Sequence, residues 1–159
     1  MRKLCSTVVK VAVGVIVLVA LMFLVGMRRK SPLVQDRVRR FNKKVGNPKQ
    51  MQTAGQPGAW TSVVRHVGRA SGTAYETPVE AHATDDGLLI SLPYGPVTDW
   101  VKNVLAAGRA TIVRDGETFE VDCPELVPVS TVMDRLPKRE QIVLRLFDVR
   151  ECLQVRRVR

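Results

Sequence analysis

The sequence predicts a mainly β protein of the β-rich α+β class, a split β-barrel with one or two inserted helices, preceded by an N-terminal transmembrane helix. An uncharged apolar run fills residues 11–27. After residue 60, short runs rich in β-branched residues alternate with Gly, Asp and Ser turns, and only two helix-like segments interrupt them. We therefore expect a membrane anchor over 1–30, a basic amphipathic helix and linker over 31–59, and a cofactor-binding barrel over 60–159.

The apolar run is long enough to cross a bilayer. Only Lys10 interrupts its extension back to residue 7, and the stretch 7–27 would be about 31 Å long as a helix, close to the hydrocarbon thickness. The alternative is a cleaved signal peptide, which would have a shorter apolar region followed by small residues. Here Arg28, Arg29 and Lys30 follow the run directly. The sequence favours a single-pass anchor.

The charge distribution indicates orientation and excludes one class of partner. Lys and Arg total 25 against 15 Asp and Glu, but the excess lies before residue 50 and the rest is nearly neutral. A nucleic-acid-binding domain would need clustered cations there, so we expect no nucleic-acid partner. More basic residues follow the apolar run than precede it, which predicts a cytoplasmic C-terminal domain. Three cysteines without a disulfide framework agree with a reducing compartment, and Cys5 is either acylated or without a role.

A short amphipathic helix is predicted over 31–46. Ser31 is a suitable N-cap, Pro32 suits the first helical position, and Gly46 can end the helix in a left-handed conformation. Its apolar residues recur at helical spacing: Val34, Val38, Phe41 and Val45. The helix either lies on anionic lipid, with its cations near the headgroups, or packs its apolar face on the domain. Residues 47–59 are predicted to be a linker.

The barrel elements follow from alternation and turn signals. We predict strands over 61–67, 76–83, 87–93, 110–114, 117–123, 125–129 and 152–158, and helices over 99–107 and 137–147. Asp115-Gly116 is the strongest hairpin signal, and Asp85 to Gly87 is a second tight turn. Gly108 is expected to stop the first of the two helices.

Few residues carry recognisable catalytic chemistry. His66 and His82 are the only histidines, and Cys123 and Cys152 form no CxxC, so we expect no metal site. A two-histidine, one-carboxylate site is the alternative. The sequence has no GxSxG and no P-loop. The turn GRASG (68–72) could offer backbone N–H groups, a hydroxyl and a cation to an anion such as phosphate, or it is an ordinary Gly-Ser hairpin turn.

A second segment has the same character. The strand that ends near residue 93 runs into the loop Tyr94-Gly95-Pro96, which leads to the N-terminus of the helix over 99–107. Backbone N–H groups at such a helix start favour an anionic or acceptor-rich ligand. Neither this segment nor the 68–72 turn names a ligand by itself.

Together these segments resemble one family. In order, the sequence has G-R-x-S-G at 68–72, T-P-V at 77–79, a Y-G at 94–95 and D-W-x-x-N-V-L-A-A-G at 99–108. This run, over about residues 65–113, resembles the deazaflavin-dependent nitroreductase family, actinobacterial relatives of flavin-binding split-barrel proteins whose acceptors include quinones and nitro-compounds. The resemblance implies a membrane-anchored oxidoreductase that binds the 8-hydroxy-5-deazaflavin coenzyme (coenzyme F-420) and transfers hydride to or from a lipophilic acceptor.

The resemblance also implies roles for particular residues. The coenzyme phosphate would be held by Arg69, Ser71, Gly72 and Thr73, with Lys102 as a further contact. The ring would lie on Pro78 and Val79, with Tyr94 and Gly95 at the ring or ribityl chain and Trp100 and Asn103 closing the site. Tyr94 or His66 could donate a proton to a reduced quinone. Barrels of this kind often pair as homodimers through their sheets, although an anchor could replace that contact.

The sequence departs from the family near its C-terminus. Family members with reductase activity tend to have tyrosines there that shape the substrate pocket, whereas residues 124–159 contain one aromatic residue, Phe147. Two further hypotheses therefore stay open. The same barrel could use flavin mononucleotide (FMN), or it could be a non-catalytic protein that binds a lipid or cofactor at the membrane.

Overall fold

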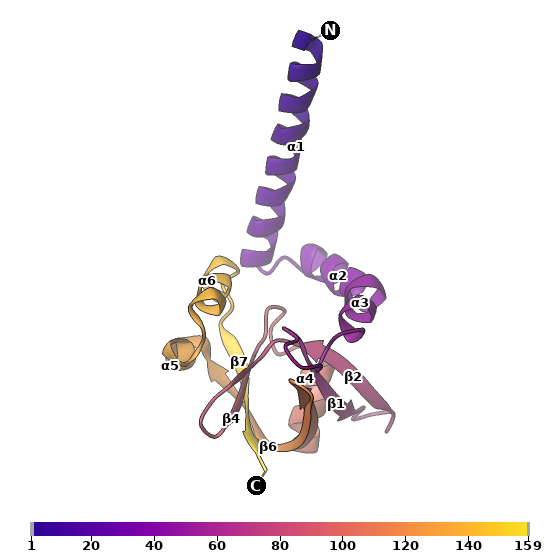
Figure 1. Ribbon diagram of the computed structural model, residues 1–159, viewed down its shortest axis with the longest axis vertical. Coiled ribbons are helices and arrows are strands. Elements are labelled where there is room, and N and C mark those ends of the chain that lie inside the picture. The colour runs from indigo at the N-terminus through magenta and orange to yellow at the C-terminus, as the bar shows by residue number, and fades with distance from the viewer. Residues whose placement is uncertain (1, 159) are drawn as a thin grey trace.

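A long helix stands on a β-rich domain (Figure 1). The structure, a computed structural model, describes the backbone of residues 2–158 and the side chains of residues 10–158, so the side chain of Cys5 lies outside the described part. Helix α1 (Arg2–Arg28) is followed by α2 (Pro32–Phe41), the π-helical turn η1 (Asn42–Gly46) and α3 (Asn47–Met51). The apolar side chains of α1 that the structure describes are almost all exposed, and this helix is long and apolar enough to cross a membrane.

The predicted end of the amphipathic helix is wrong. Gly46 has a φ of −66° and a right-handed conformation, and the chain stays helical through η1 and α3 to Met51. Pro48 falls in the first turn of α3, where a missing N–H is tolerated, and the wider π-helical turn precedes it. The predicted linker is therefore shorter, and part of it is fixed: the N–H of Gly55 donates to the carbonyl of Thr61, and its own carbonyl accepts from Gly116.

Seven antiparallel strands form one curled sheet in the order β2-β1-β5-β6-β7-β4-β3. The strands are β1 (Ser62–Val67), β2 (Ala74–Val79), β3 (Ala81–Ala83), β4 (Gly87–Ser91), β5 (Arg109–Arg114), β6 (Glu117–Pro128) and β7 (Glu151–Arg157). The two edge strands, β2 and β3, are consecutive in the chain and only Glu80 lies between them. The two edges of the sheet must therefore meet at Glu80, which closes this corner of a half-barrel.

This arrangement corrects two predicted strands. The run 76–83 is not one strand, because residues on either side of Glu80 pair with opposite edges of the sheet. The segments 117–123 and 125–129 are not separate strands, because both belong to β6. A register shift between Asp122 and Glu125 marks a bulge, where Cys123 has a φ of +49°. Such a bulge lets a long strand bend across the barrel without ending.

Several local predictions are confirmed. Asp115 and Gly116 both have positive φ, 53° and 80°, as a tight hairpin turn between β5 and β6 requires. Helix α4 spans Asp99–Ala107, and Gly108 ends it with a φ of 68°. Helix α6 (Lys138–Leu146) occupies most of the second predicted helix. Two short helices before it, α5 (Val129–Val132) and η2 (Met133–Arg135), are too short to show a helical period in the sequence.

Buried side chains form two clusters on the two faces of the sheet. The first fills the half-barrel and includes Val64, Ile112 and Leu153, with α4 packing Val101 and Val104 into it. The second lies between the sheet and the C-terminal helices and includes Leu89, Leu144 and Cys152. Helix α6 is thereby fixed on the sheet, and the base of α1 is attached to α6, because Arg28 donates to the carbonyls of Arg145 and Leu146 at 3.1 and 2.9 Å.

Candidate functional site

Arg69 joins the β1–β2 turn to helix α4. Its backbone N–H and its Nη1 donate to Oδ1 of Asn103 at 3.2 and 2.8 Å. Nη1 also lies 3.5 Å from the carbonyl oxygen of Asp99, and Nη2 lies 3.2 Å from its Oδ1. Asn103 is buried, whereas the Asp99 side chain is 87% exposed. The guanidinium is therefore held at the surface by one buried and one exposed partner.

His66 extends this network into the barrel wall. Nδ1 of its ring lies 3.2 Å from Nδ2 of Asn103, and Nε2 lies 3.1 Å from Oγ1 of Thr77. The ring also stacks on Tyr75, with centroids 5.8 Å apart. Burial lowers the pKa of His66, so the neutral ring is favoured. The chain Thr77–His66–Asn103–Arg69 connects residues of three separate sequence motifs.

This histidine should make stability depend on pH. The histidine has a pKa near 6.5 in the unfolded chain and a lower pKa in the folded protein. As the pH falls through this range, the unfolded state binds the proton more readily, so the folded state becomes less stable relative to it. We expect the free energy of unfolding to decrease between pH 7 and 5, and less so in His66→Gln than in the wild type. Urea unfolding at each pH measures the difference. The control is Tyr75→Phe, which keeps the titrating ring, and an identical pH slope in His66→Gln and the wild type would contradict the assignment.

The turn has some donors left for a ligand. The N–H groups of Gly68 and Gly72 bond within the turn, and that of Thr73 donates to Oγ of Ser71 at 3.3 Å. Gly72 has a φ of +66°, and a Cβ there would contact nothing within 4 Å, so this side of the turn is open. The Arg69 guanidinium has five N–H donors. Two of them, the N–H on Nε and one N–H on Nη2, have no protein partner among the described residues. The turn can therefore accept a small anion, in competition with the carboxylate of Asp99.

The other residues expected near the ring lie on β2 and α4, the two elements that flank this turn. Val79 is in the barrel core, and Pro78 is half-buried beside it on β2. Trp100 is half-buried against the same core from α4, and Lys102 is exposed on that helix. These side chains thus lie on the two elements, β2 and α4, that the Arg69 network connects.

Tyr94 and Gly95 belong to a different environment. The Tyr94 hydroxyl accepts a hydrogen bond from Nδ2 of Asn42 at 2.6 Å, which brings the loop after β4 to the N-terminal helices. Burial raises the pKa of Tyr94, and the Asn42 contact works in the opposite direction. A hollow of about 520 Å³ lies here, lined by Phe23, Arg37, Val38, Phe41, Asn42 and Tyr94. Sequence reasoning missed this contact, because nothing local relates Asn42 to Tyr94.

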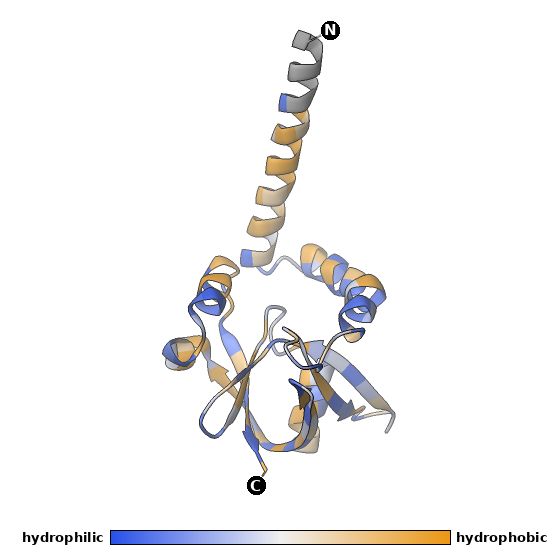
Figure 2. Ribbon diagram, viewed as in Figure 1, coloured by the Kyte–Doolittle hydropathy of each residue, from blue (hydrophilic) through white to orange (hydrophobic). Residues whose placement is uncertain are grey.

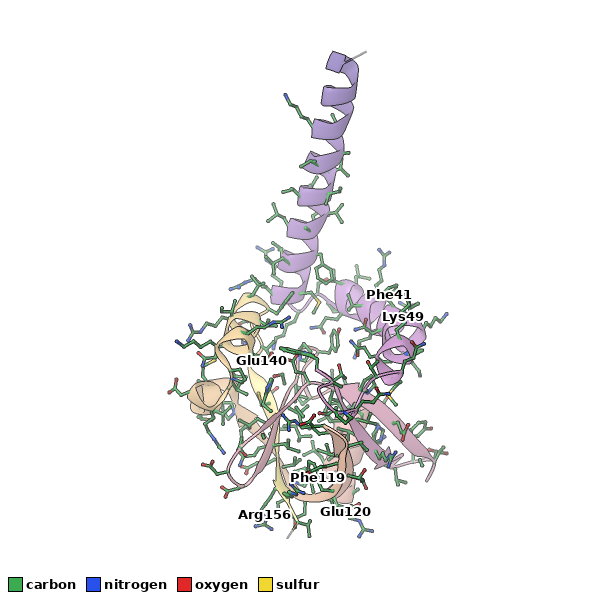
Figure 3. All side chains as sticks on the ribbon, viewed as in Figure 1. Phe41, Lys49, Phe119, Glu120, Glu140 and Arg156 are labelled. Atoms are coloured by element: carbon green, nitrogen blue, oxygen red, sulfur yellow. The ribbon has the colours of Figure 1, made fainter. Side chains whose placement is uncertain are left out.

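A larger open groove of about 1120 Å³ lies at the end of the barrel away from α1, where Figure 3 places Phe119 and Arg156. It runs past the β3–β4 and β5–β6 turns and the end of β7. Two of its arginines are already engaged: Arg156 with Asp122 at 3.0 Å, and Arg157 over the ring of Phe119 at 4.3 Å. Neither this groove nor the hollow at Tyr94 is lined by the 68–73 turn.

Three further ionisable residues meet where the sheet edges join. Glu80, His82 and Glu140 each offer a ligand-type atom within 4.8 Å of the others. Neither glutamate was predicted from the sequence, and His82 was considered only with His66 in a two-histidine, one-carboxylate site. A Glu-x-His spacing across an expected strand was the only available signal, and it gave no hint of Glu140, which lies on α6 (Figure 3).

Comparisons with known proteins do not identify a family. No family model matches the chain, and no curated protein matches it. Among solved structures, HutZ, the heme storage protein from Vibrio cholerae, is 12% identical with a TM-score of 0.48, over 63% of this chain and 82% of that one. An F420 reductase is 15% identical with a TM-score of 0.42, over 68% and 92%. The Agrobacterium tumefaciens protein Atu2129, of unknown function, is 14% identical with a TM-score of 0.42, over 63% and 55%.

Proposed function

We propose that this chain is a membrane-anchored oxidoreductase that binds the 8-hydroxy-5-deazaflavin coenzyme and exchanges hydride with a lipophilic acceptor such as a quinone or a nitro-compound. The observation that carries the proposal is the connection between motifs. The G-R-x-S-G turn, the T-P-V strand and the D-W-x-x-N helix are the segments that resemble the deazaflavin-dependent family. In the fold they are joined through Arg69, Asn103, His66 and Thr77.

The residues of the turn suit the phosphate of such a coenzyme. Arg69 is oriented by Asn103 before any ligand arrives, so little side-chain freedom would be lost on binding. Ser71 and the open side of Gly72 would lie beside the anion, with Thr73 holding the hydroxyl of Ser71 in place. Pro78 on β2 and Trp100 on α4 would border the ring. When bound, the reduced deazaflavin would supply two-electron hydride transfer, and the protein would position it.

The N-terminal region supports a position at the membrane. Helix α1 is apolar and exposed along the length whose side chains are described, and apolar residues of α2 and α6 are exposed at the same end of the domain (Figure 2). They include Leu33 at 76%, Phe41 at 61% and Ile142 at 65% exposure. Arg28, Arg29 and Lys30 follow the apolar run, and the positive-inside tendency favours a cytoplasmic domain. A bilayer above α2 and α6 would cover these side chains.

The hollow at Tyr94 suits a lipophilic acceptor. It is bordered by Phe23 of α1 and by Val38 and Phe41 of α2, so it opens where a bilayer would end. The Tyr94 hydroxyl, whose pKa is raised by burial, keeps its proton at neutral pH and could donate it to a reduced quinone oxygen. This arrangement would let an acceptor enter from the lipid phase.

The test is an anaerobic titration of the full-length protein, in nanodiscs, with the oxidised deazaflavin coenzyme and in parallel with FMN. We expect saturable quenching of deazaflavin fluorescence and weaker binding of FMN. A single-turnover reaction of the reduced coenzyme with a menaquinone analogue should then oxidise it. Tight binding of FMN would favour the flavin alternative. Binding of the reduced deazaflavin without its oxidation by the menaquinone analogue would favour a carrier. If the deazaflavin shows no saturable binding, the proposal is wrong.

The exposed acid beside Arg69 gives a second prediction. If the phosphate binds Arg69, the carboxylate of Asp99 at 3.2 Å competes with it and repels it. Asp99→Asn should therefore increase coenzyme affinity by about two- to fivefold, because an electrostatic interaction between exposed groups contributes up to about 1 kcal/mol and is weakened by high salt. Glu76→Gln is the matched control, because it removes the acid partner of another exposed arginine, Arg65, on the neighbouring strand. An unchanged or lower affinity in Asp99→Asn would move the phosphate away from this turn.

A further inference from the structure

Glu80, His82 and Glu140 converge from two distant parts of the chain. Glu80 is the single residue between the edge strands, His82 lies in β3, and Glu140 lies on α6 above them. Nε2 of His82 is 3.7 Å from Oε1 of Glu80 and 3.8 Å from Oε2 of Glu140. The imidazole thus stands between two carboxylates, close to both and bonded to neither.

Two of these atoms are buried without a partner. Oε1 of Glu80 and Nε2 of His82 make no hydrogen bond within the described part of the chain and have almost no contact with solvent. Buried polar atoms of folded proteins nearly always have a partner, so two adjacent exceptions aimed at each other need an explanation. A bound cation between them is one that fits both atoms, because each can offer it a lone pair.

Glu140 is held as a ligand would be. Its side chain is 3% exposed, and its Oε1 accepts a hydrogen bond from the Ser91 hydroxyl at 2.5 Å, which directs Oε2 towards His82. Hydrogen bonds of this kind orient the carboxylates that bind metals. Leu144, on the same helix and 1% exposed, fixes α6 on the sheet, so the position of Glu140 does not depend on a mobile segment.

The separations suit a metal ion. Bonds of about 2.0–2.2 Å at tetrahedral angles place two ligand atoms about 3.4 Å apart. The observed 3.7 and 3.8 Å exceed this by a few tenths of an ångström, and the ligand atoms of Glu80 and Glu140 lie within 4.8 Å of each other, so side-chain rotations would have to draw the three atoms together on binding. One imidazole and two carboxylates together suit divalent ions from Mn²⁺ to Zn²⁺ better than Mg²⁺ or Ca²⁺, which prefer oxygen alone.

The geometry points to a divalent transition-metal site formed by Oε1 of Glu80, Nε2 of His82 and Oε2 of Glu140, with Zn²⁺ as the ion bound most tightly of Mn²⁺, Co²⁺ and Zn²⁺. Three protein ligands leave a fourth position for water or a substrate, as in catalytic rather than structural zinc sites. The Glu80 side chain is 29% exposed and is the most accessible of the three ligands.

The surrounding groups are compatible with a cation. Burial and the neighbouring Glu140 raise the pKa of Glu80 to about 7, with Trp60 and Arg139 opposing, and a metal ion would relieve this carboxylate repulsion. Burial lowers the pKa of His82, with Arg114 contributing and Glu140 opposing, which keeps the imidazole unprotonated for coordination. Burial and Glu140 raise the pKa of Cys152 to about 11, with Ser91 opposing.

This site shares no ligand atom with the phosphate-binding turn, although Pro78, which would border the ring, lies two residues from Glu80. The Arg69 turn and Glu80 lie at opposite ends of β2, about 20 Å apart at about 3.3 Å per residue. Zn²⁺ binding is therefore measured without the coenzyme and coenzyme binding without Zn²⁺, so that failure of one proposal is distinguished from failure of the other.

The test is calorimetric titration of the full-length protein in nanodiscs with ZnCl₂, after treatment with EDTA and its removal. We expect one Zn²⁺ per chain, no detectable Mg²⁺ binding, and a higher melting temperature with Zn²⁺. Co²⁺ should give a visible absorption spectrum that changes in His82→Gln. Glu140→Gln and His82→Gln should each lower Zn²⁺ affinity more than about 100-fold, and Ser91→Ala about 10- to 100-fold, as an orienting partner does.

The control is Glu125→Gln, an exposed carboxylate on β6, which should bind Zn²⁺ like the wild type. If Glu140→Gln does not fold, His82→Gln, whose side chain is less buried, decides the matter alone. Absent saturable Zn²⁺ binding by the wild type would overturn the proposal, as would equal affinity in His82→Gln. The first result would mean that no Zn²⁺ site exists here, and the second would mean that Zn²⁺ binds elsewhere on the chain.

Discussion

Arg69→Ala is expected to lower the affinity for the oxidised deazaflavin coenzyme by about 10- to 100-fold. Hydrogen bonds to charged groups contribute about 1.5–3 kcal/mol, and every 1.4 kcal/mol is a factor of ten in the dissociation constant. The guanidinium is already oriented by Asn103, so its loss removes a positioned donor pair and not a mobile surface charge. Fluorescence titration of wild type and variant in the same nanodiscs measures the effect.

Arg65→Ala provides the matched control for this experiment. Arg65 is also an exposed arginine paired with an acid, Glu76 at 2.8 Å, but it lies on β1 outside the turn. Its replacement should leave coenzyme affinity within about twofold of the wild type. An exposed ion pair of this kind contributes at most about 1 kcal/mol to folding stability, and it makes no contact with the coenzyme in the proposed site. Equal losses in both variants would mean that the basic charge of the surface, and not the turn, binds the coenzyme.

The second large effect concerns the anchor. Replacing both Val17 and Leu18 by arginine should abolish retention of the chain in membranes after alkaline extraction. These residues lie at the middle of the apolar run, where each arginine costs about 2.5–3.5 kcal/mol of insertion free energy. The described apolar side chains of α1 have almost no protein cover, so no packing within the domain would offset this cost.

The control for the anchor is Leu33→Arg with Phe41→Arg, two exposed positions on α2 after the span. That pair should leave retention after alkaline extraction unchanged, because the apolar run of α1 is intact. Mass spectrometry of the membrane-bound wild type should give the uncleaved chain, and a reporter fused after residue 159 should be cytoplasmic. A shortened, soluble product would instead assign residues 1–27 to a cleaved signal sequence.

Local features of the fold were predictable because their signals are contained within a few residues. The Asp115-Gly116 turn, helix α4 with its Gly108 stop, and the apolar helix α1 each depend on conformational preference or periodicity within one segment. The errors arose where tertiary pairing overrides local preference. The run 76–83 alternates like one strand, but closure of the sheet divides it at Glu80.

The candidate coenzyme site was predictable in part. The turn at 68–72 and helix α4 were both singled out from the sequence, and the fold brings Arg69 and Asn103 into contact. Their competitor Asp99 was expected only as a possible start of the helix. Tyr94 was expected near the same ring, but its hydroxyl bonds to Asn42 of the N-terminal helices, a contact between segments 52 residues apart. No local pattern encodes such a contact.

By itself the sequence determined the apolar helix, the alternation of strands and turns, and the segments that resemble one coenzyme-binding family. Only the tertiary structure decided which side chains face one another: Asp99 with Arg69, Asn42 with Tyr94, and Glu80 and His82 with Glu140. The physical reason is that periodicity fixes the face on which a side chain lies. Its partner is fixed by the order in which strands pair and by the point where the two edges of the sheet meet, which depend on contacts along the whole chain.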